Sequence, residues 1–230
     1  MKIGVALKEG QEKLRISNIK TFLLDSEILI SKALKKNRKF IILNSDQEIK
    51  QKNYDYFREL INERAIGKPI AYLTGKKDFW KYEFGINNSV LIPRPDTEVI
   101  IEKVLKIFKN KSKINLLDIG VGSGCILLSV LKEKKNFMGT GIDLSKESLK
   151  ICQINAYKLG LKNRIKLIKS DIDNFEYGKY DLIISNPPYI KKLDLKYLER
   201  DVINFEPKLA LDGGLDGISE IRKIIKKSSG

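Results

Sequence analysis

Apolar residues recur every three or four positions through the first part of the chain, the spacing of helices with one buried face. Residues 12–65 contain no glycine or proline that would interrupt such helices. Gly67 and Pro69 then end the pattern. We therefore predict a small helical unit. Its apolar positions are Leu14, Ile16, Ile19, Phe22, Leu23, Ile28, Leu29, Ile30 and Leu34, followed by Tyr54, Phe57, Leu60 and Ile61.

Near residue 80 the apolar positions begin to alternate with polar ones, as they do in half-buried strands. The alternation predicts a β-hairpin over residues 79–92, with Asn87 and Asn88 in its short turn. After the hairpin, either Asp96 or Thr97 is placed to cap a helix over residues 99–108.

Short apolar runs then alternate with helical stretches along the rest of the chain. This order predicts an α/β fold in which a parallel sheet has helices on both faces. Ser145 is the expected N-cap of the second helix in this region, and Gly160 lies just past its end. The predicted strands are residues 114–119, 137–142, 165–168 and 182–185, and the predicted helices are residues 125–131 and 145–159.

Composition excludes several kinds of chemistry. The 230 residues include no histidine, which excludes histidine bases, histidine-assisted nucleophiles and histidine-ligated metals. Cys125 and Cys152 are the only cysteines, too few for a zinc site, so we expect no metal and no disulfide framework. The N-terminus lacks the apolar core of a secretory signal, and no apolar run approaches the ~20 residues of a membrane span. We therefore expect a cytoplasmic protein that does not bind membranes.

The charge leaves the type of partner open. The chain carries 44 basic and 29 acidic residues, a net charge of +15, which attracts phosphate backbones. However, the basic residues are mostly lysines spread along the chain, as compositional bias also produces, and arginine is the better reader of phosphates and bases. Nucleic acid is thus a possible partner that the charge alone does not establish.

A glycine-rich motif follows the first predicted strand of the sheet and opens a helix. Its residues are Gly120, Val121, Gly122, Ser123 and Gly124. Glycines permit a tight turn and a close approach of the backbone to a ligand at a helix N-terminus. The alternative is a turn without a ligand. Asp143, 19 positions after the last glycine and at the end of the second strand, is placed to bind a ribose diol; otherwise it would cap the next helix, a role that Ser145 already fits.

Two further motifs follow the third and fourth predicted strands. Asp171 is placed to accept from an adenine amino group and Ile172 to pack on the purine, although a loop aspartate is common in any protein. After the fourth strand, the two prolines of the next motif fix φ and carry no N–H, which holds a carbonyl, an amide and an aromatic ring in one place. Such a set suits a planar NH2 group. The motif is Asn186, Pro187, Pro188 and Tyr189.

Taken together, these motifs resemble those of class I S-adenosylmethionine-dependent N-methyltransferases. Longer segments resemble one family among them, the peptide chain release factor glutamine methyltransferases of the HemK/PrmC type. These segments are residues 67–73 (GKPIAYL) with Gly75 and Phe79, residues 91–98 (LIPRPDTE), residues 205–207 (FEP), residues 210–214 (ALDGG) and residues 216–217 (DG). The resemblance covers about residues 64–225 and follows a helical unit of the expected kind.

The resemblance implies methyl transfer from S-adenosylmethionine to the side-chain amide of a glutamine in a release factor. Asn186, Pro187 and Tyr189 would act in catalysis, and Pro188 would help to bind the substrate. Asn186 would also contact the cofactor, together with the glycine motif, Asp143, Asp171 and Ile172. Arg94 and Glu98 would order either the cofactor pocket or the hairpin; the alternative is that they are only a structural link between the domains. We expect a monomer divided into a helical substrate-recognition domain (1–76), a β-hairpin linker (77–94) and a Rossmann-like catalytic domain (95–230).

Two other functions stay open at this point. DNA and RNA amino methyltransferases share the Asn-Pro-Pro-Tyr motif, and the net charge of +15 favours them. The family also has further strands that complete its sheet, and only the first four are expected here, which would leave the fourth strand at an edge. A cofactor- or RNA-binding protein without catalytic activity would fit such an incomplete sheet.

Overall fold

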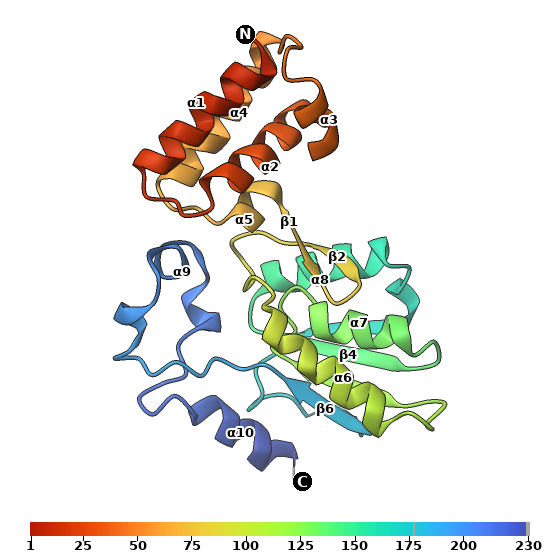
Figure 1. The fold of residues 1–230 in the computed structure, drawn as a ribbon. Coiled ribbons are helices and arrows are strands. Elements are labelled where there is room, and N and C mark those ends of the chain that lie inside the picture. The colour runs from red at the N-terminus through yellow and green to blue at the C-terminus, as the bar shows by residue number, and fades with distance from the viewer. Residues whose placement is uncertain (177, 229–230) are drawn as a thin grey trace. The chain divides into compact units, whose positions relative to one another are not determined.

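The N-terminal part of the computed structural model is helical, as predicted (Figure 1). The structure describes residues 1–176 and 178–228, and it separates the chain into a unit that ends at Thr74 and one that begins at Gly75. Within the described ranges, no helix is long and apolar enough to cross a membrane. The first unit contains α1 (Ile3–Ile16), α2 (Phe22–Leu34), α3 (Arg38–Leu43), α4 (Gln51–Ala65) and α5 (Ile70–Thr74).

Helices α1, α2 and α4 form the core of this first unit. Gly10 of α1 lets α4 approach closely, because an added Cβ would lie 2.6 Å from Cζ of Phe57. A nearly buried ion pair of 2.7 Å joins Asp25 of α2 to Arg64 of α4. Much of the apolar stripe predicted from the sequence forms a real core, in which Leu14, Leu29, Ile30, Phe57, Leu60 and Ile61 are buried. Two of the predicted positions are wrong, because Ile16 and Leu23 are exposed.

A β-hairpin begins the second unit, but its turn is not where the sequence predicted it. Strand β1 (Lys76–Phe79) pairs antiparallel with β2 (Tyr82–Gly85), so Trp80 and Lys81 form the turn, and Asn87 and Asn88 lie beyond the second strand. Trp80 has a φ of +56°, which asparagine or glycine adopts more readily. Tertiary bonds hold it there: its N–H donates to Glu98 at 2.7 Å and its indole N–H to Glu133 at 2.9 Å.

The helix after the hairpin begins without the predicted side-chain cap. A 3-10 turn, η1 (Pro95–Thr97), runs directly into α6 (Glu98–Ile107), and neither Asp96 nor Thr97 is a capping side chain in the described structure. The carbonyls of the 3-10 turn accept the N–H of Glu98 instead, so the backbone supplies what a cap would have supplied. The boundaries at residues 76 and 94, predicted between the substrate-recognition domain, the hairpin linker and the catalytic domain, stay a prediction.

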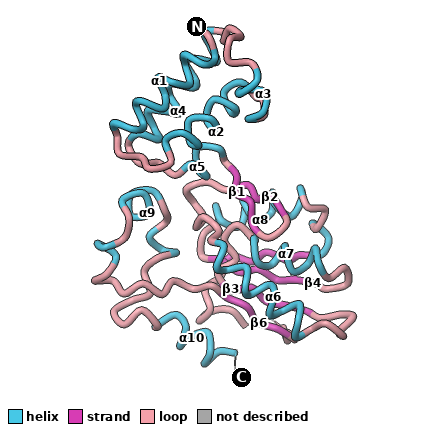
Figure 2. The backbone as a smooth tube through the Cα atoms, in the orientation of Figure 1, coloured by secondary structure: helices cyan, strands magenta, loops and turns pink. Residues whose placement is uncertain are grey.

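The four predicted strands form one parallel sheet in the order β5-β4-β3-β6 (Figure 2). Ser145 caps α8, as predicted, because its side chain accepts the N–H of Ser148 at 3.1 Å, and Gly160 follows that helix with a φ of +70°. The elements are β3 (Asn115–Ile119), α7 (Cys125–Glu133), β4 (Met138–Asp143), α8 (Lys146–Lys158), η2 (Lys162–Arg164), β5 (Ile165–Lys169) and β6 (Leu182–Ser185).

Each face of the sheet buries its own apolar cluster. The larger cluster joins the hairpin, α6, α7 and α8 to one face, where Phe79, Phe84 and Leu116 are buried. The smaller cluster lies on the other face around Leu117 and Ile142, and Ile224 of the last helix packs against it. The chain after β6 contains η3 (Leu195–Tyr197), α9 (Arg200–Phe205), η4 (Lys208–Ala210) and α10 (Ser219–Ser228).

Candidate active site

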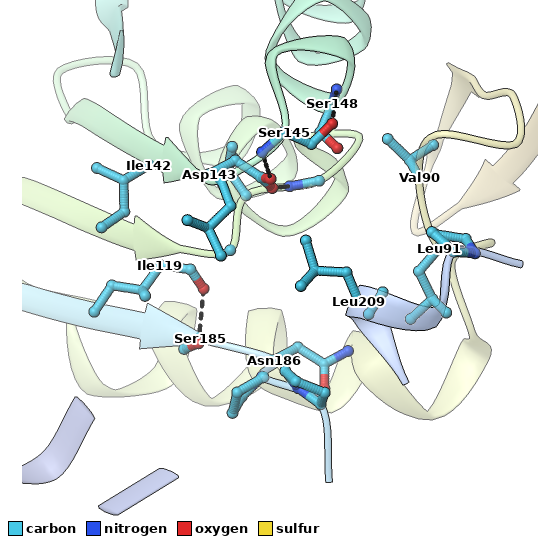
Figure 3. Close-up of a pocket in the computed structure, with 18 of the residues that line it drawn as sticks. Val90, Leu91, Ile119, Ile142, Asp143, Ser145, Ser148, Ser185, Asn186 and Leu209 are labelled. Carbon is cyan, nitrogen blue, oxygen red and sulfur yellow. Dashed lines mark hydrogen bonds between the residues drawn. The ribbon is translucent and has the colours of Figure 1, made fainter. Parts of the chain in front are cut away.

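A cavity of about 610 Å³ opens at the carboxyl edge of the sheet, where ligands bind in open α/β folds (Figure 3). Pockets for small molecules are typically about 300–1,000 Å³. Loops after all four strands contribute to its wall. Within the described part of the chain, Gly124 and Tyr189 are the only predicted site residues outside the lining. Those that line it are Gly120, Val121, Gly122, Ser123, Asp143, Asp171, Ile172, Asn186, Pro187 and Pro188.

The glycine loop (residues 120–124) is held largely by backbone hydrogen bonds, within the loop and to the end of β4. The N–H groups of Gly120 and Val121 both donate to the carbonyl of Ile142 at 2.9 Å, and the N–H of Gly124 donates to Val121 at 2.8 Å. The three glycines have φ angles of +75°, +53° and +80°, a region that suits glycine. A Cβ at the first of them would meet no atom within 4 Å, so the loop leaves open space beside its backbone.

Asp143, at the end of β4, ties the glycine loop to α8. Its two carboxylate oxygens accept the N–H groups of Gly122 and Ser145, each at 2.9 Å. Asp143 therefore has a structural role at the start of α8: Ser145 caps that helix, and Asp143 in turn accepts the N–H of Ser145. Burial raises the pKa of Asp143, and the two N–H groups act in the opposite direction. Each oxygen has a second lone pair with which it can accept a hydrogen bond from a hydroxyl group of a ligand in the cavity.

Asp118 supports the same loop from below and was missed by sequence reasoning as a separate functional residue. It lies on β3, and its fully buried carboxylate accepts the backbone N–H of Leu127 in the first turn of α7. The N-cap residue of α7 is Gly124, which has no side chain to do this. Oδ1 of Asp118 has no hydrogen-bond partner among the described residues. Burial raises the pKa of Asp118 to about 7.

Asn155 is a second missed residue, and nothing in its sequence context distinguishes it. It is buried on α8, where its side-chain oxygen accepts the N–H of Gly85 at 2.7 Å. Its amide nitrogen donates to the carbonyls of Gly85 at 2.9 Å and Ser123 at 2.8 Å. One amide thus fixes the hairpin and the glycine loop to the same helix.

Asp171 and Ile172 form the wall of the cavity after β5. The carboxylate of Asp171 accepts the backbone N–H of Asn174 at 2.7 Å, and this bond lowers its pKa. Ile172 is buried in the smaller apolar cluster and gives the cavity an apolar surface beside that carboxylate. Helix α10 lines the cavity as well, through Glu220, Lys223 and Ile224.

The proline loop (residues 186–189) follows β6. Ser185 fixes its beginning, because the hydroxyl donates to the carbonyl of Ile119 at 2.7 Å (Figure 3). Asn186 lines the cavity, and its side chain makes no hydrogen bond with another described residue, so its amide is available to a ligand. The Tyr189 side chain is 65% exposed.

The wall opposite the strands comes from two segments that are far apart in sequence. Glu206 is buried and accepts the N–H of Ile92 at 3.1 Å, and it also pairs with the guanidinium of Arg94. Arg94 lines the cavity together with Leu209, whereas Glu98, at the start of α6, accepts the N–H of Trp80 in the hairpin turn. The structure therefore places Arg94 at the cavity and Glu98 at the hairpin, although the sequence did not distinguish their roles.

Comparisons with known proteins agree with this arrangement. Residues 5–75 match the family model described as PrmC N-terminal domain, and residues 97–213 match the one described as methyltransferase small domain. The catalytic domain of hMettl16, solved in complex with the MAT2A 3'UTR hairpin 6, shares the fold alone. Its TM-score is 0.53 at 18% identity, covering 64% of this chain and 56% of that one.

Two curated relatives are similar over nearly the whole chain. The release factor glutamine methyltransferase of Buchnera aphidicola subsp. Acyrthosiphon pisum is 37% identical, over 99% of this chain and 80% of the relative. The protein of that name from Clostridium acetobutylicum is also 37% identical, over 99% of this chain and 81% of the relative. Because the identity extends through both units, the chain belongs to the release factor glutamine methyltransferase family.

Proposed function

We propose that this protein transfers a methyl group from S-adenosylmethionine to the side-chain amide nitrogen of a glutamine in peptide chain release factors. One observation carries the proposal. The amide of Asn186, which has no hydrogen-bond partner in the part of the chain that the structure describes, lines the same cavity as the glycine loop and Asp143. A group that accepts amide N–H bonds therefore lies in one space with groups suited to a nucleoside and an amino acid.

The residues of the cavity fit S-adenosylmethionine. The glycine loop leaves room for the methionine part, and the spare lone pairs of Asp143 suit the ribose hydroxyls. Asp171 accepts from the adenine amino group, and Ile172 packs on the ring. When bound, this cofactor supplies an electrophilic methyl group on a sulfonium.

The proline loop orients the nucleophile. An amide nitrogen is weakly nucleophilic because its lone pair is delocalised into the carbonyl. The side-chain oxygen of Asn186 and the carbonyl of Pro187 accept its two N–H groups, and Pro188 stiffens the loop. The exposed ring of Tyr189 packs on the amide plane. Held in this way, the nitrogen would be placed to accept the methyl group that the bound cofactor would supply, with S-adenosylhomocysteine as the leaving group and water as the acceptor of the amide proton. Orientation of this kind can supply about 7–11 kcal/mol.

The two units divide the work in this proposal. Residues 1–76 recognise the release factor, the hairpin region 77–94 links the units, and residues 95–230 carry the chemistry in a monomer. Acting on a release factor places the protein in the cytoplasm. Nucleic acid is the less favoured substrate, because the relatives that match nearly the whole chain are named for release factors.

A transfer assay with methyl-labelled S-adenosylmethionine tests the proposal. A bacterial release factor is offered in one reaction and total RNA with DNA in another, followed by mass spectrometry of the labelled product. We expect one methyl group on a single glutamine, and none when that glutamine is replaced by alanine. Label on nucleic acid alone would show that the substrate is wrong. Binding of the cofactor without transfer to either substrate would favour a non-catalytic role.

A further inference from the structure

The end of the proline loop is held by a backing segment (residues 211–217). Beyond Tyr189, the chain runs parallel to this segment and bridges to it. The N–H of Ile190 donates to Leu211 at 3.2 Å, and its carbonyl accepts the N–H of Gly213 at 2.8 Å. One step further, the N–H of Lys192 donates to Gly214 at 2.9 Å. Backbone bonds therefore fix the end of the proline loop.

Gly213 lies where this contact is tightest. A Cβ there would lie 2.8 Å from Cα of Tyr189 and 2.9 Å from the carbonyl oxygen of Pro188. It would also lie 2.8 Å from the carbonyl oxygen of Gly217. All three atoms belong to the backbone, so no side chain can rotate away. Gly213 is not among the glycines with a positive φ, so close approach, and not conformation, requires a glycine here.

The proline loop needs such support because it cannot hold itself. Pro187 and Pro188 have no N–H to donate, so backbone bonds of their own cannot fix the middle of the loop. Ser185 anchors its beginning, and the backing segment anchors its end. A shift of the backing segment would therefore move the carbonyl and amide groups that face the cavity.

We infer that Gly213 is a positioning residue, which sets the place of Asn186 and Pro187 through backbone contact with Pro188 and Tyr189. The inference rests on the proposed function, since it assigns to Gly213 an effect on the methyl-transfer step. The inference predicts that cofactor affinity and turnover depend on different segments around the cavity. Cofactor affinity depends on the glycine loop and Asp143, whereas turnover depends on the backing segment.

The test compares Gly213→Ala with the wild type in full-length protein, using a release factor as substrate. The Ala variant is expected to lower kcat by at least about tenfold, because misplacement by 1 Å can cost about 10²-fold. The dissociation constant of S-adenosylhomocysteine is expected to stay within about twofold, since the glycine loop is untouched. Gly160→Ala is the control: its φ is +70°, no atom lies within 4 Å of an added Cβ, and it is remote from the loop.

A second variant keeps the test decisive if Gly213→Ala folds poorly. Ser219→Ala removes the bond of 2.6 Å from its hydroxyl to the carbonyl of Gly213 without adding an atom, and a smaller fall in kcat is expected. Unchanged kcat in both variants, or equal losses of kcat and cofactor affinity, would overturn the positioning role. A wild type that methylates no release factor would instead overturn the proposed function, and the inference with it.

Discussion

The glycine loop and the proline loop follow the neighbouring strands β3 and β6, line the same cavity and are stabilised in different ways. The glycine loop is held through its own N–H groups: those of Gly120 and Val121 bond to Ile142 at the end of β4, and that of Gly122 bonds to Asp143 on the same strand. The proline loop has few donors of its own and depends on a segment more than twenty residues further along the chain. Both loops are thus tied to segments far away in sequence, but the glycine loop has N–H groups to make these bonds, whereas the middle of the proline loop has none.

This difference indicates how the site can be altered. Changes to the glycine loop disturb the start of α7 and the end of β4, so stability and cofactor affinity should fall together. Changes around the proline loop leave the sheet intact, so turnover should fall alone. A variant of one loop that shows the loss expected for the other would contradict this comparison. The following predictions run from the largest expected effect to the smallest.

Replacing Asn186 by alanine should have the largest effect. Its side chain has no partner among the described residues, so the fold loses no hydrogen bond, while the substrate loses the group that orients its amide. We expect transfer to a release factor to be abolished, a loss of at least about 10²-fold. The melting temperature should match the wild type, and the affinity for S-adenosylhomocysteine should fall far less than transfer does, because Asn186 is only one of several residues expected to contact the cofactor. Full activity in this variant would remove the proposed role of the proline loop.

The support of the glycine loop should depend on pH through Asp118. Folding raises its pKa from 3.8 to about 7, chiefly by burial, so the neutral form is favoured in the folded state. Its contribution to stability is fully present below pH 3.8 and is lost as the pH rises through 7. A shift of about three units corresponds to about 4 kcal/mol.

Asp118→Asn should lack this contribution because an amide does not ionise. Unfolding by urea between pH 4 and pH 8 measures the effect. The free energy of unfolding of the wild type should fall relative to the variant as the pH rises. Parallel curves for the two proteins would show that the carboxyl group does not ionise differently on folding.

Much of the second unit could be predicted from sequence because its strands are short apolar runs separated by local signals. Ser145 and Gly160 mark the two ends of α8 by their own chemistry, and the structure confirms both. The predicted position of the hairpin turn was wrong, because it rested on a local preference of asparagine for turns. The actual turn is held by hydrogen bonds that Trp80 donates to Glu98 and Glu133, residues that lie far away in sequence.

The site shows the same division. The residues of the glycine loop were recognised from their spacing, and all but Gly124 line the cavity. Asn155 and Glu206 were not found as supporting residues, because each acts through a contact with a distant segment. Asp118 was not found either, because its role depends on its burial beneath the helix that follows. A buried aspartate or asparagine in a single sequence does not differ from an exposed one until the fold shows what surrounds it.

Gly124→Ala should affect the glycine loop in both ways at once. Its φ of +80° costs a residue with a Cβ about 1–2 kcal/mol. That Cβ would also lie 2.6 Å from Sγ of Cys152, for a total loss of about 2 kcal/mol or more. Thermal unfolding and titration with S-adenosylhomocysteine should show reduced stability and affinity together. Gly160→Ala, with a φ of +70° and open space around it, should lose stability alone; equal affinities in the two variants would argue against a specific role for the loop.

The smallest effect is expected at Ser185, where the two loops are joined. Its hydroxyl donates to the carbonyl of Ile119, the residue that precedes the glycine loop, so Ser185→Ala removes one partly buried hydrogen bond. The expected cost is about 1 kcal/mol of stability. Because the bond anchors the beginning of the proline loop, kcat should fall a few-fold while cofactor affinity changes little. Steady-state kinetics with a release factor and titration with S-adenosylhomocysteine distinguish the loops: a larger loss of affinity than of kcat would mean that Ser185 serves the glycine loop instead.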